Sequence, residues 1–198
     1  MTVVIITGGG GFLGQCLCTS LLGDRKICPG SDDVETEISR IILADVAFPP
    51  VDKMQPAIAQ GVANEMVTFR QGSIESAEFC NSLVSEHDES VSIFHLGAVM
   101  SGTGETDFDL CINVNLYGTI NMLEAARAHP SSRVKFIMAS AGAIVGSGAP
   151  NDWIQKEDVI TDSVRATPKT TYGATKACSE LLLADYSRRS FIDGRGAR

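Results

Sequence analysis

The sequence predicts an α/β protein built on a doubly wound parallel sheet. Short β-branched runs alternate along the 198 residues with longer segments whose apolar residues recur at helical spacing. The β-branched runs are mainly apolar, as in strands that are buried on both faces. Strands that alternate with helices in this way favour right-handed crossovers and a parallel sheet. With 44% hydrophobic and 20% charged residues, we expect one globular domain over residues 1–198.

The individual elements follow from these patterns. The predicted strands are Thr2–Ile6, Arg40–Ala44, Met66–Arg70, Ser92–Leu96 and Val134–Ala139. The predicted helices are Phe12–Leu22, Ala77–Ser85, Phe108–Ala128 and Thr171–Arg188. Two polar segments interrupt the alternation. Asp24–Glu37 is interpreted as a surface insertion, and Gly146–Thr170 as a loop that faces the substrate.

Charge and composition argue against several classes of function. The chain carries 24 acidic and 16 basic residues, for a formal charge of −8, which disfavours binding to nucleic acid or to an anionic membrane. No signal peptide or membrane span is predicted. The six cysteines have no metal-ligand spacing, so we expect reduced thiols, no metal site and a cytoplasmic location.

A glycine-rich segment follows the first strand and opens the first helix. Its glycines at positions 8, 11 and 14 have the spacing Gly-x-x-Gly-x-x-Gly. Gly8 allows a tight turn, Gly11 lets backbone N–H groups approach a pyrophosphate, and Gly14 lets the helix pack on the sheet. Phe12 and Leu13 lie in the same turn, and we expect them to contact the cofactor. A flexible surface turn is the alternative interpretation.

Asp45 stands at the end of the second predicted strand, where the adenine ribose of a dinucleotide would lie. Its carboxylate accepts from ribose hydroxyls and repels a 2′-phosphate, so the sequence favours NAD over NADP as the cofactor. The offset of Asp45 from Gly14 is long, which we attribute to the Asp24–Glu37 insertion. The alternative is an exposed loop aspartate.

Tyr172 and Lys176 lie four residues apart on one face of the last predicted helix. A tyrosine beside a cation can have its pKa lowered by roughly 1–3 units, which suits proton exchange with a secondary alcohol. Lys176 would also hold the nicotinamide ribose. The alternative is a solvated helix face, which the glycine-rich segment and Asp45 make less attractive.

Together these motifs resemble the extended short-chain dehydrogenase/reductases, over essentially the whole chain and with a Rossmann fold. The resemblance implies that Leu96, Gly97 and Ala98 line the cofactor and that Asn115 supports the active-site proton path. His95 is interpreted as a packing residue of the strand end, with a catalytic role as the alternative. The segment containing Ser73 and Ile74 resembles the family's adenine contact, with Ser73 where an aspartate is usual.

Three further stretches resemble the D-erythronate dehydrogenase branch of this family: Val99–Gly102, Asp107–Leu110 and Glu180–Arg189. The resemblance implies hydride transfer between NAD and a secondary alcohol of a small sugar acid or related polyol. A nucleotide-sugar 4-epimerase is the nearest alternative. Relatives pair two long helices across a dimer interface, so Phe108–Ala128 and Thr171–Arg188 predict a homodimer.

Two departures from the family pattern bear on activity. Ala141 stands where members carry a Ser or Thr that binds the reacting oxygen, and losing such a donor can cost on the order of 10²-fold in rate. Ser140 would replace it only if the backbone turns there, which Gly142 would allow. The chain also stops where relatives continue into a substrate-binding domain, which we expect to be largely absent. A non-redox catalytic or binding role is therefore a third alternative.

Overall fold

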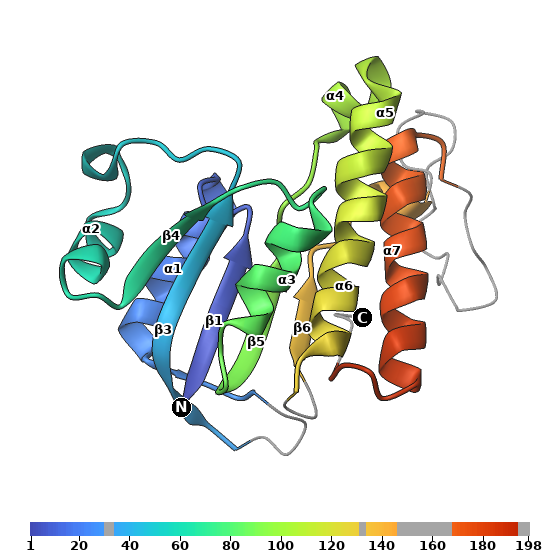
Figure 1. Cartoon of the computed structure of the whole chain (residues 1–198). Helices are drawn as coiled ribbons and strands as arrows, with labels where there is room; N and C mark the ends of the chain where they lie inside the picture. Colours follow the sequence, from blue (N-terminus) through green and yellow to red (C-terminus); the bar gives the residue numbers. More distant parts are fainter. Residues whose placement is uncertain (30–33, 131–133, 146–167, 194–198) are drawn as a thin grey trace, which may run out of the picture.

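The computed structural model describes residues 1–29, 34–130, 134–145 and 168–193. In these ranges the centre of the molecule is a six-stranded sheet (Figure 1). Its parallel strands lie in the order β4–β3–β1–β5–β6. Their bounds are β1 Thr2–Thr7, β3 Thr36–Asp45, β4 Val67–Gln71, β5 Ser90–His95 and β6 Lys135–Met138. The predicted doubly wound parallel sheet is confirmed.

β1 lies at the centre of the sheet and pairs with a different strand on each side. Thr7, its last residue, is in register with Ala44 of β3 on one side and with His95 of β5 on the other. The chain therefore winds outward from β1 in two directions. The carboxyl ends of these three strands meet at one edge, where a parallel sheet of this type binds its ligand.

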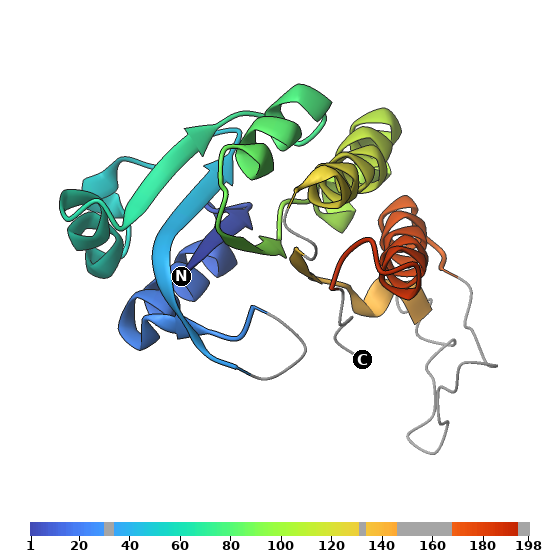
Figure 2. The same cartoon turned by 60° about the horizontal axis from the view of Figure 1, so that its bottom comes forward.

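Helices cover both faces of the sheet (Figure 2). α1 (Phe12–Asp24) and α2 (Pro56–Ala63) pack on one face, where Val4 and Ile6 of β1 are buried. α3 (Ala77–Ser85), α6 (Gly118–Ala128) and α7 (Thr171–Arg188) cover the other, over Val3 and Ile5. Alternating β1 residues thus enter two separate cores, which is why that strand is apolar from Val3 to Ile6.

The predicted helix Phe108–Ala128 is found, but it is not uniform. It consists of α5 (Phe108–Cys111), a π-helical turn η2 (Ile112–Tyr117) and α6. A short helix before it, α4 (Ser101–Thr106), was not predicted. Its glycines disfavour a helix locally. Gly104 is required by packing, because a Cβ there would lie 2.8 Å from the Cys111 sulfur.

The prediction that Asp24–Glu37 is only a surface insertion is wrong in part. β2 (Lys26–Ile27) pairs antiparallel with Thr36 and Glu37, so β3 begins earlier than predicted. A 3₁₀ turn η1 (Val51–Lys53) and α2 fill the connection to β4 and were also not predicted. Of the Gly146–Thr170 segment, residues 146–167 lie outside the described residues.

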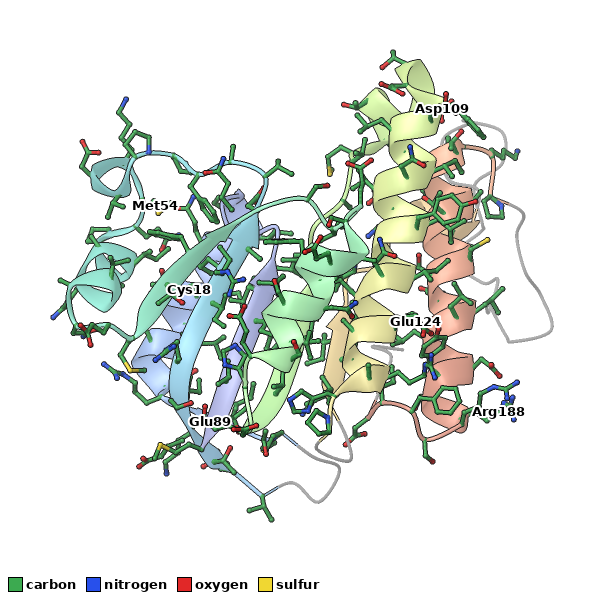
Figure 3. The ribbon with its side chains drawn as sticks, in the orientation of Figure 1. Cys18, Met54, Glu89, Asp109, Glu124 and Arg188 are labelled. Atoms are coloured by element: carbon green, nitrogen blue, oxygen red, sulfur yellow. The ribbon has the colours of Figure 1, made fainter. Side chains whose placement is uncertain are left out.

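The lower ends of α6 and α7 are joined by a polar and aromatic cluster. Glu124 points from α6 toward α7 (Figure 3), where the Tyr186 hydroxyl donates to it. Arg127 also pairs with Glu124 and lies over the Phe191 ring. Just beyond α7, the backbone of Asp193 forms a parallel β-bridge with Lys135 of β6. The chain therefore pairs with the edge of the sheet at this residue.

Two further observations concern the described part of the chain. None of its helices combines the length and apolar character needed to cross a lipid bilayer. All six cysteines carry free thiols.

Candidate functional site

The glycine turn, Gly8–Gly11, lies between the end of β1 and the start of α1. Gly8 has a φ of +71°, a conformation that side chains other than glycine rarely adopt. A Cβ on Gly14 would lie 2.4 Å from the Gly8 carbonyl oxygen, so helix α1 can approach the turn only because residue 14 is glycine. The roles predicted for these two glycines agree with this geometry.

The first turn of α1 is open to a ligand. Its backbone N–H groups have no carbonyl partner within the helix, and the N-cap residue Gly11 has no side chain to offer one. The positive end of the helix therefore points to the carboxyl edge of the sheet, as an anion site requires. Phe12 and Leu13 are 78% and 62% exposed beside it, which leaves these apolar side chains free to contact a cofactor.

Asp45 closes the other side of the glycine turn. Its Oδ2 accepts from the Gly10 N–H at 2.9 Å, and its Oδ1 accepts from the Val46 N–H at 2.7 Å. A Cβ on Gly10 would lie 2.6 Å from the Ala47 carbonyl oxygen, so the turn and the end of β3 are in close contact. These residues fit a dinucleotide with its pyrophosphate at the helix end and its ribose at Asp45.

Tyr172 and Lys176 lie on α7, with Lys176 buried at 3% exposure. The Lys176 Nζ donates to the Ala139 carbonyl oxygen at 2.9 Å and lies 5.9 Å from the centre of the Tyr172 ring. The two side chains therefore share a face, as predicted. Burying an ammonium group is costly, and burial lowers the pKa of Lys176.

The predicted fall in the pKa of Tyr172 is wrong for this structure. Burial raises the pKa of the phenol above its usual value, and the nearby Cys111 adds to the rise. The Lys176 ammonium lies over the ring and is turned to the Ala139 carbonyl. Desolvation of the phenolate is the main cause of the rise.

The start of α7 is fixed by neighbouring elements. The Thr170 hydroxyl accepts from the Gly173 N–H at 3.0 Å, and Glu105 of α4 accepts from the Thr171 N–H at 3.2 Å. A Cβ on Gly173 would lie 2.5 Å from the Ala143 carbonyl oxygen, so α7 packs directly on the 3₁₀ turn η3 (Gly142–Val145). Tyr172 thus stands where α7 meets α4 and η3. Thr170 and Glu105 were not singled out from the sequence.

The segment with the missing hydroxyl turns away from the sheet. β6 ends at Met138, and the backbone turns into η3 at Gly142. Ser140 and Ala141 lie between the end of the strand and this turn. Ser140 is exposed. Whether Ser140 takes over the role of the missing hydroxyl at Ala141 stays a prediction.

Asn115 is buried in the π-helical turn η2, and its side chain holds one residue of the loop after β5. Its Oδ1 accepts from the Val99 N–H at 2.7 Å, and its Nδ2 donates to the Val99 carbonyl at 3.0 Å. Its backbone carbonyl accepts from the Ser179 hydroxyl of α7 at 3.3 Å. Asn115 therefore joins three elements around Tyr172 and Lys176.

The predicted lining segment Leu96–Ala98 follows β5 and packs on the glycine turn. Leu96 N–H donates to the Thr7 carbonyl, and Gly97 N–H donates to the Thr7 hydroxyl at 3.1 Å. A Cβ on Gly8 would lie 2.8 Å from the Gly97 nitrogen. The structure thus brings this segment to the predicted cofactor site.

The predicted adenine contact has a more complex structure than the sequence suggested. The Ser73 hydroxyl donates to the Glu75 carboxylate at 2.9 Å, so an acidic group does lie at this position. The Ile74 side chain is buried against Gly118 of α6 and is not available to a ligand. Asn121 donates to the carbonyls of Ile74 and Glu75, each at 3.0 Å, and fixes the segment.

Comparison with known proteins agrees with this arrangement. The profile of the NAD dependent epimerase/dehydratase family matches residues 4–198. D-erythronate dehydrogenase of Haemophilus influenzae is 37% identical over 191 residues, which are 96% of this chain and 52% of that protein.

Solved structures show the same fold. The nucleoside-diphosphate-sugar epimerase of Agrobacterium tumefaciens superposes with a TM-score of 0.75 at 30% identity, over 99% of this chain and 52% of that one. UDP-glucose 4-epimerase of Thermus thermophilus, solved in complex with NAD, has a TM-score of 0.71 at 21% identity, over 98% of this chain and 53% of that one. The chain spans about half the length of these relatives.

Proposed function

Because the chain belongs to the NAD dependent epimerase/dehydratase family, we propose that it binds NAD and oxidises a secondary alcohol of a small sugar acid. The observation that carries the proposal is the buried Lys176, held by the Ala139 carbonyl beside Tyr172. A buried lysine that donates only one of its three protons to a described group still has donors for ribose hydroxyls. The glycine turn and Asp45 supply the other half of a dinucleotide site.

NAD, when bound, accepts the hydride that leaves the alcohol carbon. The protein's part is to remove the hydroxyl proton, and we assign that role to the Tyr172 oxygen. A phenol is protonated at neutral pH, and burial raises the pKa of Tyr172 further, which suits proton donation to a ketone in the reverse direction. To accept a proton, the phenol needs a positive charge nearby, and Lys176 is the nearest described cation on its helix face.

The substrate class rests on similarity. The 37% identity to a D-erythronate dehydrogenase supports a small sugar acid. The 30% identity to a nucleoside-diphosphate-sugar epimerase supports the second candidate, a sugar epimerase that would return the hydride within one catalytic cycle. Net NADH formation separates the two, because an epimerase forms none.

The experiment begins with calorimetric titration of the purified chain by NAD, followed by a screen of sugar acids for NADH absorbance. Ala141→Ser should raise NADH formation by on the order of 10²-fold, because the restored hydroxyl would stabilise the reacting oxygen. Tyr172→Phe should abolish that gain. Each variant is also made in a chimera that carries the carboxyl-terminal half of a relative.

The outcomes separate the candidate functions. NAD binding without NADH from any sugar acid, in the chimera as well, would favour a non-redox role or the epimerase. An unmodified chain that does not bind NAD would contradict the proposal as a whole.

A further inference from the structure

His95 lies at the end of β5 between two buried hydroxyl groups. Its Nδ1 is 2.9 Å from the Thr7 hydroxyl of β1, and its Nε2 is 3.1 Å from the Thr119 hydroxyl of α6. The ring is 1% exposed and packs on Phe136, with 5.7 Å between the ring centres. The predicted packing role is therefore incomplete, because both ring nitrogens are engaged.

The direction of each hydrogen bond follows from its partners. The Thr119 hydroxyl lies 2.6 Å from the Asn115 carbonyl, which can only accept, so Thr119 donates its proton there. Toward His95, Thr119 is therefore the acceptor, and Nε2 carries the hydrogen. In a neutral ring Nδ1 is then an acceptor, to which the Thr7 hydroxyl donates.

The same assignment of hydrogens also fits the hydrogen bond between Thr7 and the Gly97 amide. The Thr7 oxygen, having donated its proton to His95, still accepts from the Gly97 N–H at 3.1 Å. The series therefore runs in one direction, from the Gly97 amide through Thr7, His95 and Thr119 to the Asn115 carbonyl. A doubly protonated ring would leave the Thr7 hydroxyl proton without this acceptor.

The two ends of the series lie at different parts of the site. Thr7 and Gly97 contact Gly8, so one end fixes the glycine turn. Asn115 holds the backbone of Val99 through both atoms of its amide, so the other end fixes the loop beside Tyr172 and Lys176.

We propose that His95 is a positioning residue whose fixed tautomer links the glycine turn to Asn115 and Val99 through one directed series of hydrogen bonds. The value of this link for catalysis rests on the proposed function. The series itself does not, and it is open to tests that need no cofactor.

The first test is the ring-nitrogen NMR spectrum of the ¹⁵N-labelled chain. We expect His95 to show a protonated Nε2 and an unprotonated Nδ1 at neutral pH. The opposite tautomer, or a charged ring, would overturn the proposal.

The second test measures amide hydrogen exchange at both ends of the series. Thr119→Val removes the acceptor for Nε2 and should speed exchange at the distant Gly97 amide by about two- to tenfold, the effect of one neutral hydrogen bond. Thr7→Val should speed exchange at Val99 in the same way. Thr119→Ser keeps the hydroxyl and should restore slow exchange at Gly97.

The matched control is Ser92→Ala, on the same strand. Ser92 is as buried as His95, but its hydroxyl has no partner among the described residues, so its loss should change neither amide. If Thr119→Val and Thr7→Val each affect only their own end, His95 does not link the two ends. NAD titration is scored separately, so a chain that fails to bind NAD contradicts the proposed function and leaves the exchange result to decide on His95.

Discussion

Asp45 carries a negative charge whose place is fixed by two backbone N–H groups, those of Gly10 and Val46. Neither bond depends on a mobile side chain, so the carboxylate stays at the end of β3. Although its offset from Gly14 is long, its place at the end of the second predicted strand was enough to single it out from the sequence. The same is true of Tyr172 and Lys176, because four residues along a helix define one face without any knowledge of the fold.

Replacing Asp45 tests cofactor choice. Asp45→Asn keeps an oxygen that can accept from Gly10 but removes the charge that repels a 2′-phosphate. We expect NAD affinity to fall and the preference for NAD over NADP to narrow by about tenfold or more. Calorimetric titration with NAD and with NADP measures the two affinities and therefore the preference. Equal affinities for NAD and NADP in the unmodified chain would contradict the assignment.

The role of His95 could not be inferred from local sequence. Its partner Thr7 is 88 residues away in the sequence, on β1, and its partner Thr119 is 24 residues away, on α6. Burial, with a smaller contribution from the Lys176 charge, lowers the pKa of His95 from 6.5 to about 3. Only the folded topology brings these groups together.

This shift predicts a dependence of stability on pH. The folded pKa is below the unfolded one, so protonation favours the unfolded chain. The contribution of neutral His95 to the free energy of unfolding is fully present above pH 6.5. It is lost as the pH falls toward 3, by at most about 1.4 kcal/mol per pH unit. Urea unfolding at a series of pH values measures the slope. His95→Gln should remove this part of the slope of unfolding free energy against pH. His87 is only half-buried, so His87→Gln should change the slope much less. Equal slopes in the unmodified chain and both variants would refute the assignment.

Elements begin and end where packing demands it, and the glycines of α1 show this. Gly14 has no room for a side chain, whereas a Cβ on Gly23 of the same helix would meet nothing within 4 Å. Sequence spacing identified Gly14 because the turn motif is local. It missed α4, whose glycines oppose a helix and whose place depends on contacts with Cys111 and α7.

The two glycines provide a matched pair of substitutions. Gly14→Ala should reduce the free energy of unfolding by about 1–3 kcal/mol and weaken NAD binding, because α1 must move away from the turn. Gly23→Ala should raise the free energy of unfolding by up to about 1 kcal/mol, because alanine favours the helix. Urea unfolding measures both. Equal effects of the two changes would show that α1 is free to shift.

At the scale of the whole molecule, the alternation of strands and helices was enough to predict the sheet and its two helical layers. It carries no information on contacts between molecules. On the described surface, α5, η2 and α7 expose Phe108, Tyr117 and Leu181, at 61%, 55% and 49%. We propose that this side of the molecule forms the homodimer predicted from the family pattern.

Sedimentation at micromolar concentration tests the dimer. We expect twice the chain mass of 21.0 kDa, and a shift toward the monomer for Leu181→Glu, because a charge would be buried in the interface. Val51 belongs to η1, which contacts α2 on the other face of the sheet. Val51→Glu should therefore leave the mass unchanged. A monomeric unmodified chain would rule out this prediction.

The π-helical turn η2 has a consequence for how this stretch of sequence is compared with others. A turn of this kind holds one residue more than an α-helical turn, so the faces of α5 and α6 are out of phase by about 100°. A helical wheel drawn through residues 108–128 therefore mixes two faces. Deleting one residue between Ile112 and Tyr117 would allow regular α-helical hydrogen bonds in this turn, yet it would rotate Thr119 away from His95. If this segment is aligned without a gap to a sequence that lacks the extra residue, every later residue of α6 is displaced by one position.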